Sequence, residues 1–259
     1  MRISESTEKL SFENTLLEFL LVGSPLQDAI VAFDRANRLL RIRRNFLGKL
    51  LKEIPFSWIR RVRHHIEAIN YDLHVDGGLI LRAYPLEAHA SELSIELVDQ
   101  QKEVVYRTYW RLRWSGKDGR DVIRFTQGMA DRISAFTGIP GVIVSDELQG
   151  TFDIGSGQLT LHGECLSPPF KGLVVPFEDI RALRSIMTSR GYYAVEFCTK
   201  SRGVMLVNEG YASSTRLHET VKMIAESAGI PFELQTTDKT PSSMGRPYKP
   251  ISPTAKGSV

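Results

Sequence analysis

The sequence predicts an α+β protein that is mainly β, made of two tandem units, each a small antiparallel barrel or bent sheet capped by a C-terminal helix. Three observations predict it: a repeat of two sequence blocks, a period-two alternation of apolar and polar residues inside them, and one amphipathic helical segment late in each unit. Of the 259 residues, 42% are hydrophobic and 24% are charged, as in ordinary globular proteins. This composition excludes a collagen or a wholly disordered polymer.

The repeat consists of two blocks at a nearly constant spacing. Residues 33–42 (FDRANRLLRI) match residues 152–161 (FDIGSGQLTL) at an offset of 119 positions. Residues 54–63 (IPFSWIRRVR) match residues 175–184 (VPFEDIRALR) at an offset of 121 positions. Hairpin loops of different length between the blocks produce such a shift, so we predict that the two units are related.

The spacing of apolar residues predicts the elements of each unit. Leu40 and Ile42 alternate with Arg41 and Arg43, which is typical of a half-buried antiparallel strand. Residues 122–136 and 217–228 carry apolar residues at steps of three and four, so each predicts a helix, and Gly-Ile-Pro follows both. Residues 12–22 predict a further short apolar helix that packs on the first unit.

These elements predict four regions. Residues 1–27 form an N-terminal helical segment, residues 28–141 the first unit, residues 148–234 the second unit, and residues 235–259 a disordered tail. We expect a disordered tail because the last 25 residues contain four Pro, four Ser and four Thr without apolar periodicity.

The repeated blocks also carry a resemblance to a known family. FDRANRLLRI followed by KEIPFSWIRRV, with GIP after a helix, resembles the bacterial pleckstrin-homology-like (PH-like) domains. The resemblance covers both units and implies a tandem PH-like protein, a non-catalytic binding or scaffolding module that recruits a protein partner. It also implies an anionic lipid head group as a ligand of the first hairpin. The second unit is shorter by about 30 residues between its Pro-Phe block and its Gly-Ile-Pro ending, which leaves the completeness of its barrel open.

Positive charge is concentrated in one window of the first unit. The chain has a formal charge of +3, but residues 35–63 hold ten Lys and Arg against one Glu, a net charge of +9. Guanidinium groups bind phosphate and carboxylate groups. The candidate ligands for an anionic head group or an acidic partner are Arg38, Arg41, Arg43, Arg44, Lys49 and Lys52.

Apolar residues interleave with this basic window, and two interpretations of them stay open. Phe46, Leu47, Leu50 and Leu51 suit a loop that enters a bilayer interface. The alternative is a solvated basic edge that discourages strand pairing, with Leu50 and Leu51 in the core. The second unit lacks the arginines, because Thr160 and His162 replace them.

No catalytic motif is present, so we predict that the protein is not an enzyme and needs no cofactor. GxSxG, HExxH and GxxxxGK are absent, and His64, His65 and His74 lack ligand spacing for zinc. Two cysteines and no signal peptide predict a cytoplasmic protein, with peripheral attachment to the inner face of the membrane as a further hypothesis.

The preferred partner is another protein, with an anionic membrane surface second. Two alternatives from other classes remain. One is a nucleic-acid binder that uses Arg107, Arg111 and Arg113, which the small net charge disfavours. The other is an enzyme whose site the sequence does not identify.

Overall fold

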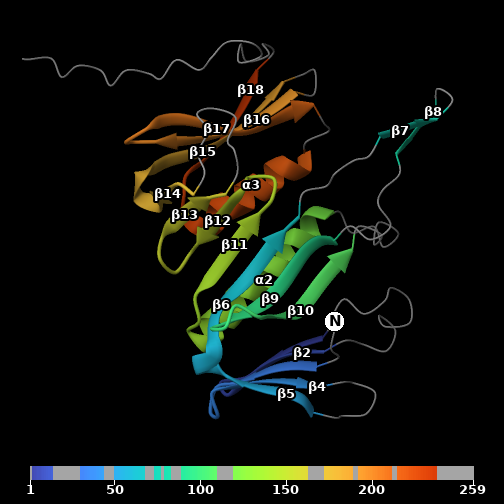
Figure 1. The fold of residues 1–259 in the computed structure, drawn as a ribbon, viewed down its shortest axis with the longest axis vertical. Helices are drawn as coiled ribbons and strands as arrows, with labels where there is room; N and C mark the ends of the chain where they lie inside the picture. Colours follow the sequence, from blue (N-terminus) through green and yellow to red (C-terminus); the bar gives the residue numbers. More distant parts are fainter. Residues whose placement is uncertain are drawn as a thin grey trace, which may run out of the picture. The chain divides into compact units, whose positions relative to one another are not determined.

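The computed structural model describes ten segments of the chain: residues 2–13, 30–43, 50–67, 73–76, 79–82, 89–109, 119–162, 172–188, 192–211 and 215–237. The chain divides into two compact units. Unit 1 comprises Met1–Glu147 with Asp153–Gly155, and unit 2 comprises Leu148–Phe152 with Ser156–Val259. Figure 1 shows the strands and helices of both.

Unit 1 begins with a five-stranded antiparallel sheet in the order β1-β2-β3-β4-β5. Its strands are β1 (Arg2–Glu5), β2 (Lys9–Glu13), β3 (Ile30–Asp34), β4 (Leu39–Arg43) and β5 (Leu50–Pro55). Leu40 and Ile42 of β4 are buried, whereas Arg41 is part-exposed and Arg43 is exposed. The predicted alternation in this strand is therefore confirmed.

A short 3-10 helix, η1 (Phe56–Trp58), leads from β5 into the second sheet of unit 1, which has the order β10-β9-β6-β11. Its strands are β6 (Ile59–Ile66), β9 (His89–Leu97), β10 (Lys102–Tyr109) and β11 (Gly141–Ser145). A two-stranded hairpin, β7 (Leu73–Asp76) and β8 (Leu79–Arg82), lies between β6 and β9 in the sequence.

The helix α2 (Gly119–Thr137) lies along one face of this sheet (Figure 1). Its residues Met129, Ile133 and Phe136 join the same core cluster as Leu93 and Ile95 of β9. This side of the sheet is called the inner face below. The opposite side of the sheet is called the outer face. Because side chains alternate along a strand, it carries those residues of β6, β9 and β10 that do not point toward α2.

Unit 2 repeats this sequence of elements. The strands β12 (Gly150–Asp153), β13 (Gln158–Leu161) and β14 (Val174–Pro176) are neighbours in that order, and the 3-10 helix η3 (Phe177–Asp179) follows. A second sheet has the order β17-β16-β15-β18 and comprises β15 (Ile180–Thr188), β16 (Tyr192–Thr199), β17 (Gly203–Tyr211) and β18 (Phe232–Thr237). Helix α3 (Thr215–Ala228) precedes β18.

Equivalent backbone hydrogen bonds mark the two sequence repeats. The backbone amide of Phe56 donates to the carbonyl of Arg38 over 2.9 Å. The backbone amide of Phe177 donates to the carbonyl of Gly157 over 2.8 Å. The prolines before these two aromatic residues have nearly identical dihedral angles, φ −60° and ψ 142° in η1 and φ −61° and ψ 141° in η3. The two Pro-Phe blocks therefore occupy equivalent places in their units.

The end of each unit repeats as well. The strand that follows each helix runs parallel to the strand after the 3-10 turn, so β11 pairs with β6 and β18 pairs with β15. Gly138 and Gly229, directly after the helices, both have a positive φ, 73° and 64°. A residue without a side chain adopts this conformation without strain, which explains why glycine ends both helices.

Three expectations about the fold need correction. Residues 2–13 form β1 and β2 rather than a helix, because Leu10 and Phe12 alternate with polar residues and fill the core of the first sheet. The predicted tail begins too early, since β18 continues to Thr237. Among the described residues the sheets are open and do not close into barrels. The rest of the helix predicted over residues 12–22 and the rest of the tail predicted over residues 235–259 lie outside the described residues, since residues 14–29 and 238–259 are not described.

Candidate functional site

The predicted anion-binding residues lie on the hairpin of β4 and β5. Arg41 and Arg43 belong to β4, Lys52 belongs to β5, and Arg38 lies in the turn before β4. Arg44 and Lys49 fall outside the described residues. Arg38 and Arg43 flank opposite ends of β4, roughly 17 Å apart at about 3.3 Å per residue. These two described residues therefore do not converge on one point.

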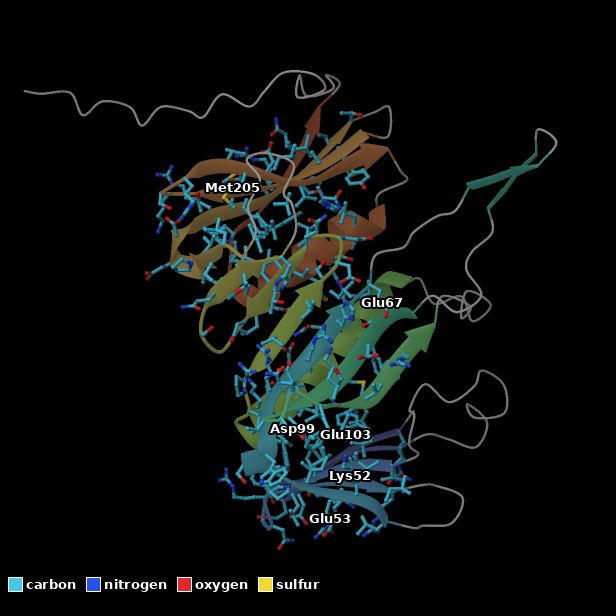
Figure 2. All side chains as sticks on the ribbon, in the orientation of Figure 1. Lys52, Glu53, Glu67, Asp99, Glu103 and Met205 are labelled. Carbon is cyan, nitrogen blue, oxygen red and sulfur yellow. The ribbon has the colours of Figure 1, made fainter. Side chains whose placement is uncertain are left out.

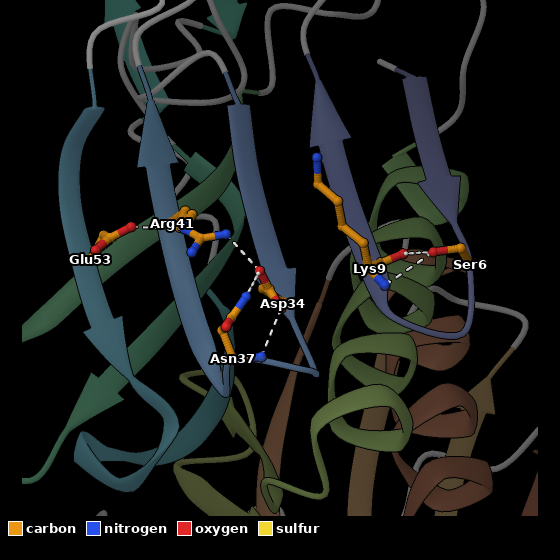
Figure 3. A network of polar contacts seen from close by, with 6 residues as sticks. All are labelled: Ser6, Lys9, Asp34, Asn37, Arg41 and Glu53. Atoms are coloured by element: carbon orange, nitrogen blue, oxygen red, sulfur yellow. Dashed lines mark hydrogen bonds and ion pairs between the residues drawn. The ribbon is translucent and has the colours of Figure 1, made fainter.

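Arg41 is held in a polar network on the surface of the first sheet (Figure 3). Its Nε donates to Glu53 Oε1 over 2.8 Å and its Nη1 donates to Asp34 Oδ2 over 2.5 Å. Asn37 donates to Asp34 through both its backbone amide and its side-chain amide, each over 2.9 Å. These hydrogen bonds from Asn37, together with the Arg41 cation, lower the pKa of Asp34. Arg41, one of the predicted ligand residues, is therefore paired with two carboxylates of the first sheet.

Two further cations of the basic window have partners inside unit 1. Lys52 forms an ion pair with Glu103 of β10, and both side chains are labelled in Figure 2. Arg35 donates from Nε and Nη2 to the carbonyl of Phe136 over 3.0 and 2.7 Å, and its guanidinium lies 4.2 Å from the centre of the Phe136 ring. Arg35 thus binds a free carbonyl at the end of α2. Several cations of the +9 window therefore contact other groups of unit 1.

The end of the hairpin that carries Arg43 has a different character. Arg43 is exposed and has no ion-pair partner among the described residues. It pairs in register with Leu50 of β5, and Leu50 and Leu51 are each 42% exposed. Leu50 and Leu51 therefore do not lie in the core, although β5 is an edge strand, as the alternative of a solvated basic edge expects. This end of the hairpin, Arg43 with Leu50 and Leu51, is called the hairpin tip below.

The histidines of β6 have structural partners. His64 is fully buried on the inner face, with Nδ1 2.6 Å from Gln127 Oε1 and Nε2 2.6 Å from Ser91 Oγ. Gln127 Nε2 in turn donates to Asp131 Oδ1 over 2.8 Å, which fixes the direction of the chain of hydrogen bonds. Burial lowers the pKa of His64 to about 4. The imidazole is therefore neutral near pH 7.

No metal site is formed by the described part of the chain, because no group of three or more His, Cys, Asp or Glu lies close enough together. His65 Nε2 lies 2.7 Å from Asp146 Oδ1, and the side chain of His74 lies outside the described residues. Cys198 is buried, which raises the pKa of its thiol, and Cys165 lies outside the described residues.

The arginines of the nucleic-acid alternative are described only in part. Arg107 forms an ion pair with Glu92 of β9, with Nη2 2.5 Å from Oε2. Arg111 and Arg113 lie outside the described residues. Tyr106, next to Arg107, is buried against the core, as the alternation in this strand predicts.

Two exposed apolar residues were not anticipated from the sequence. Trp58 of η1 is 60% exposed and Val98, after β9, is 63% exposed. The Val98 amide donates to the Trp58 carbonyl over 3.0 Å, so the two residues lie side by side. A pairing between residues 40 positions apart is set by the strand order, which local sequence does not reveal.

No protein-family model matches the chain, and no curated protein matches it either. Within the described residues, no helix is both long and apolar enough to cross a membrane.

Proposed function

We propose that the protein is a non-catalytic binding module of two PH-like units that attaches to anionic membrane surfaces through the hairpin tip of unit 1. The PH-like assignment is supported by the matching Pro-Phe turns, the matching strand pairings and the helix late in each unit. The membrane contact is supported by the composition and exposure of the hairpin tip.

The observation that carries the proposal is the exposure of Leu50 and Leu51 beside Arg43, which has no ion-pair partner in the part of the chain that the structure describes. Each leucine has 42% of its surface in water, although a strand that packs on a core buries such side chains. Burying a leucine completely is worth about 1.5–3 kcal/mol, and an arginine near an anionic surface adds about 1 kcal/mol. The hairpin tip thus combines the apolar and the electrostatic contributions that reversible membrane binding requires.

The proposal is tested by flotation with vesicles of phosphatidylglycerol and phosphatidylcholine against vesicles of phosphatidylcholine alone. We expect the protein to bind the anionic vesicles, and we expect this binding to weaken as the salt concentration rises. Salt screens the electrostatic attraction between Arg43 and the anionic surface. Leu50→Ser with Leu51→Ser, and separately Arg43→Ser, should each reduce the bound fraction several-fold. Folding is checked by circular dichroism.

Two control variants change the same residue types elsewhere in unit 1. Val98→Ser removes an apolar side chain that is more exposed than either leucine, and Arg38→Ser removes an exposed arginine at the other end of β4. Both should bind as wild type. Wild type that ignores anionic vesicles at low salt, or controls that lose binding as strongly as the hairpin variants, would contradict the proposal.

A protein partner is the second function that the chain supports, and its docking point is the pair Trp58 and Val98. Exposed tryptophan is enriched at the centres of protein interfaces. The equivalent corner of unit 2 has Asp179 and Lys200, with the Lys200 amide donating to the Asp179 carbonyl over 2.8 Å. A partner captured by wild type and lost in Trp58→Ala, but retained when Asp179 is changed to Ala, supports this docking point. Retention in the Trp58 variant contradicts it.

A further inference from the structure

Arg63 of β6 and Arg184 of β15 occupy equivalent places in the two units. They are 121 positions apart, the offset of the Pro-Phe blocks, and each belongs to the strand that follows the 3-10 turn. Each lies between an antiparallel strand on one side and a parallel strand on the other. Differences between their partners therefore reflect the side chains rather than the backbone arrangement.

In unit 2 this arginine is neutralised by two carboxylates. Arg184 Nη1 lies 3.2 Å from Glu196 Oε2, and Arg184 Nε lies 2.9 Å from Glu233 Oε2. Both glutamates are its direct register partners, Glu196 on β16 and Glu233 on β18. Residues directly opposite in neighbouring strands share one face of the sheet. The backbone at this position thus places an arginine where it binds oxyanions.

In unit 1 both carboxylates are replaced. The register partners of Arg63 are Ser94 on β9 and Val142 on β11. Among the described residues Arg63 has no ion-pair partner, although it is only part-exposed.

The nearest glutamates of β9 are occupied by other arginines. Glu96 Oε1 and Oε2 each accept a 2.9 Å hydrogen bond from Arg61, and Glu92 Oε2 accepts from Arg107 over 2.5 and 2.9 Å. These two glutamates lie two residues on either side of Ser94, on the same outer face. Among the described residues, the two glutamates of the outer face thus pair with Arg61 and Arg107, and Arg60 Nη1 also lies 3.6 Å from Glu96 Oε1, which leaves Arg63 without a carboxylate.

Ser94 carries a buried hydroxyl that no described residue satisfies. It is 0% exposed, and its hydroxyl has no hydrogen-bond partner among the described residues. Buried hydroxyl groups without a partner are rare, because an unmade hydrogen bond costs about 1–3 kcal/mol. An unpaired guanidinium and an unpaired hydroxyl thus lie opposite each other, at the position where unit 2 holds the carboxylate of Glu196.

We propose that Arg63 and Ser94 form a binding site for a small oxyanion, a phosphate or carboxylate group, that takes the place of the Glu196 carboxylate of unit 2. Arg63 supplies the charge and donates through its guanidinium, and the Ser94 hydroxyl donates to the same group once the flanking arginine side chains move aside. The site is independent of the hairpin tip, since it lies on the second sheet of unit 1 and uses none of the same residues.

The test is a titration of the full chain with sodium phosphate, and separately with sodium acetate, at an ionic strength held constant with chloride. Amide and arginine side-chain resonances are followed by NMR. We expect saturable millimolar shifts centred on Arg63, Ser94 and Val142 with at least one of the two anions, at least ten-fold weaker in Arg63→Gln. Arg60→Gln, which removes an exposed arginine three positions earlier on the same strand, should titrate as wild type.

A second variant supplies the missing carboxylate. Ser94→Glu copies Glu196 and should abolish the anion-dependent shifts while raising the melting temperature. That rise should disappear when Arg63→Gln is added, because the new carboxylate then lacks its cation. If wild type shows no saturable shift with either anion, or if Arg63→Gln titrates like wild type, the proposal is wrong.

One more arm distinguishes a free anion from a lipid head group. Vesicles that contain phosphatidic acid are floated with wild type, Arg63→Gln and Arg60→Gln. If only Arg63→Gln loses flotation, the site binds the phosphate of the lipid head group. If Arg63→Gln floats like wild type but no longer shows the phosphate-dependent NMR shifts, the site binds a free anion. Failure of the hairpin-tip variants to change flotation contradicts only the proposed function and leaves this site unaffected.

Discussion

The second sheets of the two units share one backbone arrangement and differ in the side chains at equivalent positions. On the outer face of unit 2, Arg184 is matched by Glu196 and Glu233, and on that of unit 1, Arg63 faces Ser94 and Val142. The strand pairings and the Pro-Phe turns are the same. The hydrogen bonds of the repeat are thus shared by both units, whereas the side chains at equivalent positions of the two sheets differ.

The inner faces differ at the neighbouring position. His64 of β6 corresponds to Ser185 of β15, and both are buried. His64 is bonded to Gln127 and Ser91, and it titrates with a pKa of about 4 against an ordinary value of 6.5. Unit 2 has no titratable group at this position.

The largest expected effect is therefore a loss of stability of unit 1 at acidic pH that comes from His64, although burial also lowers the pKa of His218 in unit 2. Because the folded pKa of His64 lies below the unfolded value, unfolding takes up a proton below pH 6.5. The stability of unit 1 should be full above pH 6.5, fall as the pH is lowered, and level off below about pH 4, losing about 3 kcal/mol in all. Urea unfolding followed by tryptophan fluorescence measures this, since all three tryptophans, Trp58, Trp110 and Trp114, belong to unit 1.

Two variants on the same strand sharpen this test. His64→Gln should remove the pH-dependent loss, whereas His65→Gln, whose ring bonds Asp146 on the other face, should keep it. If the stability of His64→Gln still falls as the pH is lowered, another group of unit 1 is responsible for the pH dependence.

The next effect concerns the turn before the repeated strand. Arg38 and Gly157 are the equivalent residues whose carbonyls accept from Phe56 and Phe177, and both have a positive φ, 52° and 65°. A side chain in this conformation costs roughly 1–2 kcal/mol. A Cβ on Gly157 would have no atom within 4 Å, so Gly157→Ala changes the backbone energy alone.

We expect Gly157→Ala to destabilise unit 2 by about 1 kcal/mol and Arg38→Gly to stabilise unit 1 by less than about 1 kcal/mol. Hydrogen exchange of core amides, resolved by unit, measures both changes. If the two substitutions change the free energy of unfolding in opposite directions, the two turns are equivalent. If both change it in the same direction, the turns are not equivalent.

The smallest effect compares the two arginines directly. Arg184→Met should destabilise unit 2 by about 1 kcal/mol, because it leaves the half-buried Glu196 without its cation. Burial already raises the pKa of Glu196 and Arg184 opposes that rise, so the destabilisation should shrink at acidic pH. Arg63→Met should change stability by less than about 0.5 kcal/mol in a buffer without phosphate or carboxylate. Equal losses from the two variants would mean that Arg63 has a structural partner.

The sequence predicted the repeat well because both blocks carry local signals. Proline fixes φ before each aromatic residue, and alternation marks β4 in any context. Within the helix predicted over residues 12–22, only residues 12 and 13 are described, and they belong to strand β2, which the pairing of β2 with β3 determines. The partners of the predicted basic residues were hidden from the sequence for a related reason. Asp34 and Glu53 reach Arg41 only because β3 and β5 flank β4.

The amino-acid sequence by itself determined a mainly β chain, its two related units, the Pro-Phe turns and the helices, because these depend on dihedral preferences and on the period of apolar residues. Only the tertiary structure decided which cations are free. Arg41 and Lys52 are neutralised by residues on other strands, whereas Arg43 and Arg63 have no carboxylate partner among the described residues. Charge pairing acts between side chains that are close in space, and strand register, which joins residues tens of positions apart, sets those neighbours.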